Sequence, residues 1–333
     1  MPTSTPTILP AQTAEFMGSR PIVNKRTGQV MIANDRGIRV NSILRRDDWK
    51  EFDAAVVEAA RNKLSAVQIL RGRGLEKRLG GIGSLVSYYH QASQMTAASV
   101  SMTGQSNGEN DRVEFNLAGV PIPVIFKPFS IGTRQLQADR MSGNQIDTSN
   151  VTAATIVVAE TLENMLFNGS SMVFNGQSIY GLTTHPNRAT DTASNYGGGD
   201  WGTSTNVSKT VIGMMSAAHG NGFRGPYGLF VARTQYFQML GDVSGTDKTP
   251  LQRVLELPGI EFVESSDWLA DGSVVLVQLT ADVVDIAIGA ELGVVEWMSG
   301  DGSAANFKVM MVGAPRVKSE YASKTGIVHA TSA

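Results

Sequence analysis

The sequence of 333 residues predicts an α+β protein in which both helices and strands build the core. Apolar residues recur at helical spacing over 47–64 and 150–167, whereas they alternate with polar residues or form short runs elsewhere. Gly is plentiful at 35 residues and only 17% of the residues are charged, which disfavours a helical bundle. Helices and strands follow no regular βαβ repeat, so the class is α+β and not doubly wound α/β.

The composition excludes several kinds of protein. The chain has no Cys, which excludes a disulfide scaffold, a thiolate metal site and a cysteine nucleophile. No apolar stretch approaches the roughly 20 residues of a membrane span. The first residues also lack the pattern of a signal peptide. We therefore expect a soluble globular protein that is made in a cytoplasm and has no membrane partner.

Residues 1–46 are expected to form a basic arm. They hold seven basic residues against two acidic ones, a charge of +5, whereas the whole chain has a charge of −2. The segment has little apolar periodicity, so it is not expected to fold by itself. We expect it to gain order from neighbouring subunits or from DNA, and a disordered tail is the alternative.

An amphipathic helix is expected to begin at Asp47. Its apolar positions recur at spacings of three and four, and they are Trp49, Phe52, Val56, Ala60 and Leu64. Acidic residues in the first turns and basic ones near the end complement the helix dipole. A basic, Gly-rich connector follows up to residue 83.

Residues 84–128 are predicted to form a long hairpin that projects from the body. Two β-prone runs, 85–89 and 113–126, flank a polar tip at 102–108. Pro121 and Pro123 stand at alternate positions, which an edge strand tolerates. A lone hairpin is marginal in water, so we expect it to lie on another surface. The alternative is an ordinary hairpin within a single-domain sheet.

The segment 150–167 is predicted to be a long helix that is buried on most sides. Val158, Leu162 and Leu166 belong to its most continuous apolar face. Asn168 and Gly169 supply the left-handed stop. After a loop-like stretch over 170–206 we expect two helices, 207–219 and 234–240. The expected strands are 227–232, 260–263, 274–278, 283–289, 294–298 and 307–312, of which the last two form a hairpin.

Catalytic motifs are nearly absent. The four histidines have no metal-ligand spacing, and the sequence contains no Walker A, H-E-x-x-H or G-x-S-x-G motif. Gly220–Gly225 matches G-x-G-x-x-G, but it follows a predicted helix and precedes a strand, which is the reverse of a dinucleotide site. Residues 141–300 hold six basic and sixteen acidic residues, which argues against sequence-specific nucleic-acid binding.

Five segments occur in an order that resembles the HK97-type major capsid proteins of tailed phages and the encapsulin shells that share their fold. These segments are Pro128–Arg134, Ala159–Gly169, Ile179–Asn187, Gly225–Val231 and Asp285–Leu292. The similarity extends over roughly residues 80–320. No single motif is specific, but their common order favours this family.

The resemblance implies a division of the chain. An N-terminal arm (1–46) and a helix with its connector (47–83) precede the hairpin (84–128), which corresponds to the E-loop of the family. A peripheral domain (129–206) carries the spine helix (150–167). An axial domain (207–280) and a return to the peripheral domain (281–333) follow.

The resemblance also implies a structural protein and not an enzyme, without cofactors, catalytic residues or metal sites. The first function that the resemblance implies is that of the major capsid protein of a tailed phage. Such a protein forms pentamers and hexamers, which build an icosahedral shell around double-stranded DNA. A separate scaffolding protein and a portal are implied, a decoration protein is left open, and the location is the virion after assembly in the host cytoplasm. The 46 residues before the first helix favour this over an encapsulin.

Two alternatives stay open. One is an encapsulin-like compartment shell, and the other is a soluble α+β nucleotide-binding enzyme that uses Gly220–Gly225. Covalent crosslinking is not expected, because 84–126 contains no lysine. We expect assembly contacts in the arm and the hairpin, at Arg20, Lys25, Arg26, Arg36, Arg39, Thr103, Gln105, Asn107, Arg112 and Glu114.

Overall fold

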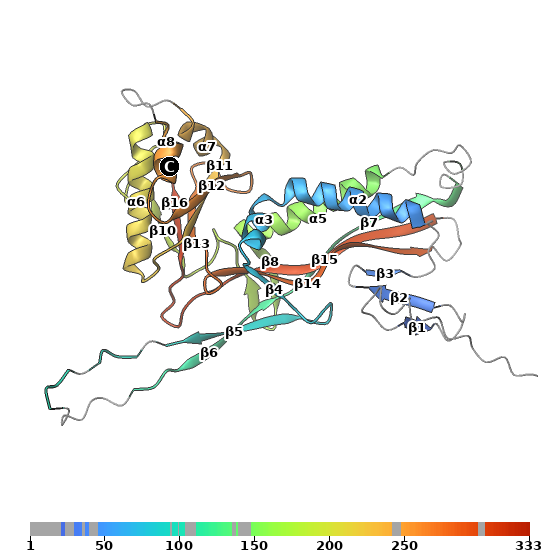
Figure 1. The fold of residues 1–333 in the computed structure, drawn as a ribbon, viewed down its shortest axis with the longest axis horizontal. Coiled ribbons are helices and arrows are strands. Elements are labelled where there is room, and N and C mark those ends of the chain that lie inside the picture. Colours follow the sequence, from blue (N-terminus) through green and yellow to red (C-terminus); the bar gives the residue numbers. More distant parts are fainter. Residues whose placement is uncertain are drawn as a thin grey trace, which may run out of the picture.

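The computed structural model confirms the α+β class, with two sheets that each carry helices (Figure 1). The structure describes residues 21–23, 30–34, 37–39, 46–93, 95–98, 100–103, 111–134, 138, 148–241, 248–298 and 304–333. A long seven-stranded sheet lies at one end of the molecule and a five-stranded sheet at the other, and a thin hairpin projects from the region between them.

The seven-stranded sheet is built on two long antiparallel strands, β14 (Val284–Met298) and β15 (Ala304–Val317). Strand β7 (Val124–Gly132) pairs with β15, and β4 (Glu76–Arg78) pairs with β14. The predicted hairpin of 294–298 and 307–312 is present. However, the strands predicted at 283–289 and 294–298 are one strand, because register shifts after Ile288 and Ala290 accommodate the glycines between them.

Helices α2 (Arg46–Lys63), α3 (Ser65–Gly72) and α5 (Ser149–Asn168) accompany this sheet, and Figure 1 shows α2 and α5 lying along it. The predicted core residues of α5 are buried, with Val158 and Leu162 at 1% exposure and Leu166 at 0%. Gly169 has φ +72°, and a Cβ there would meet the Ile179 carbonyl oxygen at 2.4 Å. Only glycine therefore suits the end of this helix.

The five-stranded sheet has the order β10 (Ala189–Thr192), β16 (Ile327–Thr331), β13 (Val274–Gln278), β11 (Tyr227–Ala232) and β12 (Ile260–Ser266). Helices α6 (Ser204–Gly220), α7 (Arg233–Met239) and α8 (Pro250–Leu255) belong to the same unit.

One boundary differs from the sequence analysis, which assigned all of 281–333 to the first unit. Strand β16 lies between β10 and β13 instead. The physical reason is that β13 is fully buried and needs a neighbour on each edge, and the apolar run of β16 supplies one of them. The five-stranded sheet thus includes strands on both sides of 207–280 in the sequence.

The projecting hairpin consists of β5 (Val86–Ala92) and β6 (Phe115–Pro121). The single strand predicted at 113–126 is divided between two sheets, since β6 ends at Pro121 and β7 begins at Val124. Pro121 and Pro123 lack the N–H group that a ladder needs, so the chain leaves one sheet and enters another at this point.

Part of the predicted arm belongs to the body of the same chain. Strands β1 (Pro21–Val23), β2 (Val30–Asn34) and β3 (Gly37–Arg39) extend the seven-stranded sheet, and β3 pairs with β14. The expectation that 1–46 gains order only from other molecules is therefore wrong for these strands. The short apolar run of residues 30–33 was a strand signal that the charge count concealed.

The stretch 170–206, expected to be loop-like, contains a small hairpin of β8 (Ser170–Phe174) and β9 (Gln177–Ile179). Asn175 and Gly176 form its turn with φ of +50° and +73°. An Asn-Gly pair with both residues at positive φ is the preferred two-residue hairpin turn.

Candidate assembly surface

The projecting hairpin has two chemically different faces. Residues directly opposite each other in an antiparallel ladder share a face, and successive residues alternate. Ser87, Tyr89 and Gln91 therefore share one face with Val120, Ala118 and Asn116. The opposite face carries Tyr88, His90, Ala92, Phe115, Leu117 and Gly119.

The second face, called here the outer face, is apolar and open to solvent. Phe115 is 69% exposed, Leu117 53% and Tyr88 50%. The rings of Phe115 and His90 meet edge to face at 6.2 Å, so the two strands already order these side chains. Beyond the strands, Met95, Val100 and Met102 continue the exposed apolar surface toward the tip.

Gly119 shapes the outer face near the base of the hairpin. A Cβ at this position would lie 2.8 Å from Val86 Cγ1 and 3.0 Å from the Tyr88 ring. The absence of a side chain therefore lets the Tyr88 ring lie flat against β6.

The first face, called here the inner face, is bound by the chain's own body, where Val120 is buried in the hydrophobic core and the polar side chains make hydrogen bonds. Ser87 is buried and accepts a hydrogen bond from Arg316 Nη1 at 2.7 Å. Gln91 Nε2 donates to the carbonyl oxygen of Ser319 at 3.0 Å and to its hydroxyl at 2.8 Å. The backbone N–H of Gly119 donates to Gln177 Oε1 at 3.3 Å. The hairpin thus turns its inner face to the body and leaves its apolar outer face exposed.

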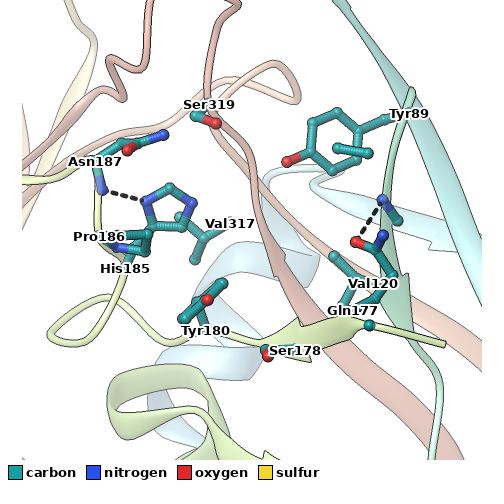
Figure 2. A pocket seen from close by; sticks show the side chains of 13 residues that line it. Tyr89, Val120, Gln177, Ser178, Tyr180, His185, Pro186, Asn187, Val317 and Ser319 are labelled. Atoms are coloured by element: carbon teal, nitrogen blue, oxygen red, sulfur yellow. Dashed lines mark hydrogen bonds between the residues drawn. The ribbon is translucent and has the colours of Figure 1, made fainter. Parts of the chain in front are cut away.

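A cavity of about 190 Å³ lies at the base of the hairpin. In Figure 2 its wall is formed by side chains from both strands of the hairpin, the β8–β9 turn, the 180–187 loop and the end of β15. Burial raises the pKa of Tyr89, and its hydrogen bonds to Ser319 oppose that shift. His185 Nδ1 accepts the backbone N–H of Asn187 at 3.2 Å. Among the described residues that line this cavity, no hydroxyl is hydrogen-bonded to the imidazole, so no nucleophile–base pair is formed.

His185 and His329 are buried, and both contact the half-buried Arg188. Arg188 donates to the His185 carbonyl oxygen at 2.9 Å and to His329 Nδ1 at 3.4 Å. Burial, followed by the charge of Arg188, lowers the pKa of each histidine to about 4. Both imidazoles are therefore neutral at pH 7.

The structure contradicts the nucleotide site at Gly220–Gly225. Gly220 is the last residue of α6, and the loop leads into β11. The loop amides are already used, because Asn221, Gly222 and Phe223 donate to carbonyl oxygens in the last turn of α6. They are not available to cradle a phosphate.

The predicted contact residues are placed as follows. Thr103, Arg112 and Glu114 lie exposed on the hairpin, and the last two line an open groove with Glu320 and Tyr321. Arg39 lies in β3, and its side chain is not described. Arg20, Lys25, Arg26, Arg36, Gln105 and Asn107 lie outside the described residues.

Sequence reasoning missed the outer face. Phe115 and Leu117 alternate with polar residues, a pattern that suggests a strand with its apolar side in the core. Two features instead indicate an apolar side that faces away from the core. They are the length of the hairpin and its lack of an apolar partner segment. Among the described helices none has the length and apolar character of a membrane span, and in the same residues no cluster of His, Asp and Glu is arranged for a metal ion.

The fold is shared with solved shell structures. A crystal structure of a virus-like particle from Pyrococcus furiosus matches with a TM-score of 0.61 and 17% identity, over 85% of this chain and 98% of that one. The capsid of Myoviridae phage XM1 matches with a TM-score of 0.58 and 12% identity, over 80% and 92% of the two chains. These likenesses confirm the predicted HK97-type fold.

Two curated relatives are encapsulin shell proteins. A diheme-cytochrome-encapsulin shell fusion protein of Kuenenia stuttgartiensis is 25% identical over 255 residues, which are 76% of this chain and 66% of the relative. The chain thus spans slightly less than two thirds of that relative. The type 1 encapsulin shell protein EncA of Myxococcus xanthus is 22% identical over 252 residues, which are 75% of this chain and 82% of the relative.

A further comparison identifies a family by sequence. The match extends over residues 38–330, from the strand that joins the arm to the sheet as far as the next-to-last residue of β16. Because it includes most of the chain, we conclude that the protein belongs to the family described as a family of unknown function (DUF6260).

Proposed function

We propose that the protein is a shell subunit whose activity is self-assembly. The observation that supports this most directly is the outer face of the hairpin, where Tyr88, Phe115 and Leu117 are exposed while the inner face is bound to the body. Complete burial of one such side chain contributes about 1.5–3 kcal/mol. Within the part of the chain that the structure describes these side chains stay exposed, so a second copy provides the cover.

The geometry of the hairpin favours a repeating contact. It projects to one side of the body (Figure 1), so the surface that gives the contact differs from the surface that receives it. A contact of this head-to-tail kind continues from copy to copy until a ring or a shell closes. The HK97-type fold supports closure as an icosahedral shell of pentamers and hexamers, as the sequence analysis expected.

For the contents we propose double-stranded DNA, with the protein as the major capsid protein of a tailed phage and the virion as its location. The support is the basic stretch at 1–46 together with the likeness to the phage XM1 capsid. Positive charge on an inner surface binds phosphates without sequence preference. A scaffolding protein and a portal are partners in this proposal.

An encapsulin-like compartment is the second candidate. The curated relatives favour it, because both are shell proteins of this type by name. In that case the shell encloses a cargo protein in the cytoplasm of its host, and no genome or portal is involved.

The experiment is to express the full chain and image it by negative-stain electron microscopy. Closed particles of uniform diameter are the expected result, and a monomer at high concentration would refute shell formation. Particles purified from their natural source are then treated with nuclease and extracted. Protected double-stranded DNA of uniform length supports the capsid, whereas a single co-purified protein inside DNA-free particles supports the compartment.

A further inference from the structure

Residues 316–321, at and beyond the end of β15, contact the hairpin at three successive levels. Arg316 reaches Ser87, and Ser319 accepts hydrogen bonds from Gln91. The Tyr321 hydroxyl donates to Glu114 at 3.0 Å. Glu114 lies opposite Ser93, since its carbonyl oxygen accepts the Ser93 N–H. The order of the three contacts along residues 316–321 therefore matches their order along the hairpin, from its base outward.

The innermost contact is held by a buried ion cluster. Arg316 and Asp285 are 1% and 4% exposed, and Arg316 Nε lies 2.6 Å from Asp285 Oδ1 while Nη2 contacts Oδ2. A carboxylate that binds two nitrogens of a guanidinium group fixes the orientation of the guanidinium plane. This leaves Nη1 aimed at Ser87, and Arg316 thereby joins β14, β15 and the hairpin strand β5.

Lys318 strengthens the same cluster from the other side of Asp285. Its Nζ lies 2.7 Å from Asp285 Oδ2 and 2.5 Å from the Ala281 carbonyl oxygen. The backbone at 318 is also fixed, because its N–H donates to Val283 and its carbonyl oxygen accepts from Thr325. Residues 316–318 are thus anchored in the body before the chain reaches the outer contacts.

The two outer contacts differ in exposure, since the Gln91–Ser319 contact is partly buried and the Tyr321–Glu114 contact is exposed. Gln91 binds both the carbonyl and the hydroxyl of Ser319, and Tyr321 is 44% exposed. Strand β6 adds one further hydrogen bond to the body, from the Gly119 N–H to Gln177 Oε1.

We propose that residues 316–321 form a brace that sets the direction in which the hairpin leaves the body: Arg316 anchors the brace, and the outer contacts of Ser319 and Tyr321 fix the direction. The consequence for assembly rests on the proposed function: the brace fixes the angle at which one copy engages the next, and therefore the diameter of the shell. The side chains of the outer face provide the contact, and the brace provides its angle.

The brace is tested first on the subunit, with spin labels. The chain has no cysteine, so Ala92→Cys on the hairpin and Ser216→Cys on α6 give two unique labelling positions, both exposed. Labelled chains are diluted into unlabelled protein, so that distances between copies do not contribute. The interspin distance distribution then reports the hairpin direction by pulsed electron resonance.

The test variant is Gln91→Ala with Tyr321→Phe, which removes the outer contacts and leaves the buried cluster intact. The matched control is Tyr180→Phe, which loses the same hydroxyl from a ring of similar exposure, 41%. We expect the distribution to broaden at least twofold or to shift in the test variant and to stay unchanged in the control. The same mean and width in both would overturn the brace.

The second measurement is the range of particle diameters in electron micrographs. We expect a mixture of diameters from the test variant and one diameter from the control. A broadened distance distribution with uniform particles would refute the link to shell diameter. If the unmodified chain forms no particles, the proposed function fails, but the distance measurement still decides whether the brace exists.

Discussion

The carboxylate of Glu163, in the middle of α5, accepts the backbone N–H of Ala66, in the first turn of α3, at 2.7 Å. It also accepts the Val67 N–H at 3.3 Å and the Ser65 hydroxyl at 3.2 Å. The first N–H groups of a helix have no partner inside it. A side chain 97 residues further along the chain thus supplies the N-terminal cap that α3 lacks locally.

We expect Glu163→Ala to lower the free energy of unfolding by about 1–3 kcal/mol, because it leaves buried N–H groups of α3 without an acceptor. Urea unfolding followed by circular dichroism measures the change. Glu163→Gln is the control, since it keeps one carbonyl acceptor, and its loss should be smaller. Equal losses in both variants would show that packing, and not the cap, is responsible.

The same residue predicts a pH effect. Burial raises the pKa of Glu163 above its ordinary value of 4.5, against the lowering effect of its hydrogen bonds. The folded state then holds its proton more tightly than the unfolded state. Stability contributed by this group is present at low pH and decreases as the pH rises through the folded pKa. The stability of the unmodified chain relative to Glu163→Gln should therefore decrease as the pH rises from 4, and an increase would contradict the shift.

Acid should lower the stability of the folded chain through His185 and His329, which both contact Arg188. Each histidine has a folded pKa of about 4, below the ordinary 6.5, so the unfolded state binds protons first as the pH falls. The stability contributed by the two neutral imidazoles is complete above pH 6.5 and is lost progressively down to about pH 4. Thermal melts across this range measure it. His329→Gln should flatten the dependence, and an unchanged slope would exclude His329 as a source.

Leu162→Ala should lower the free energy of unfolding by about 2–5 kcal/mol, because Leu162 is 1% exposed and its removal leaves a cavity in the core beneath α5. Val157→Ala, on the same helix at 45% exposure, is the control and should change stability by less than about 0.5 kcal/mol. Chemical denaturation compares the two. A Leu162→Ala chain with unchanged unfolding would mean that this face is not core.

The double variant Phe115→Asp with Leu117→Asp should prevent particle formation without changing the melting temperature. Both side chains are exposed in the subunit, so a carboxylate at either position stays hydrated in the folded monomer. When two copies associate through this face, the carboxylates are buried without a partner, which opposes association. Sedimentation and melting curves provide the two readouts. Phe115→Tyr keeps the ring and should still assemble. Normal particles from the double variant would exclude the outer face as the contact.

Much of the fold was predictable from the sequence, because most large elements have a local signal. The buried face of α5 and the strands β11 and β13 follow from apolar spacing, and the stop at Gly169 follows from its residue type. The position of β16 between β10 and β13 and the capping of α3 by Glu163 have no such signal. Both depend on partners distant in sequence, and periodicity carries no information on those partners.

The candidate site divides in the same way. The hairpin and its polar tip were predictable, but the direction of its faces was not. Alternation shows that Phe115 and Leu117 share a face, yet it does not say which face meets the body. That choice depends on Arg316 and Ser319, more than 200 residues further along the chain.

The order of strands in the five-stranded sheet has a consequence for synthesis on the ribosome. Strand β13 is made before β14 and β15, but its neighbour β16 follows them, so β13 and β10 each have an open edge until β16 emerges. Val274–Val277 are completely buried in the finished sheet, and an open apolar edge of this kind aggregates readily. A chain whose translation stops before β16 is therefore expected to be removed by aggregation or proteolysis instead of entering a particle, so that only completed copies are available for assembly.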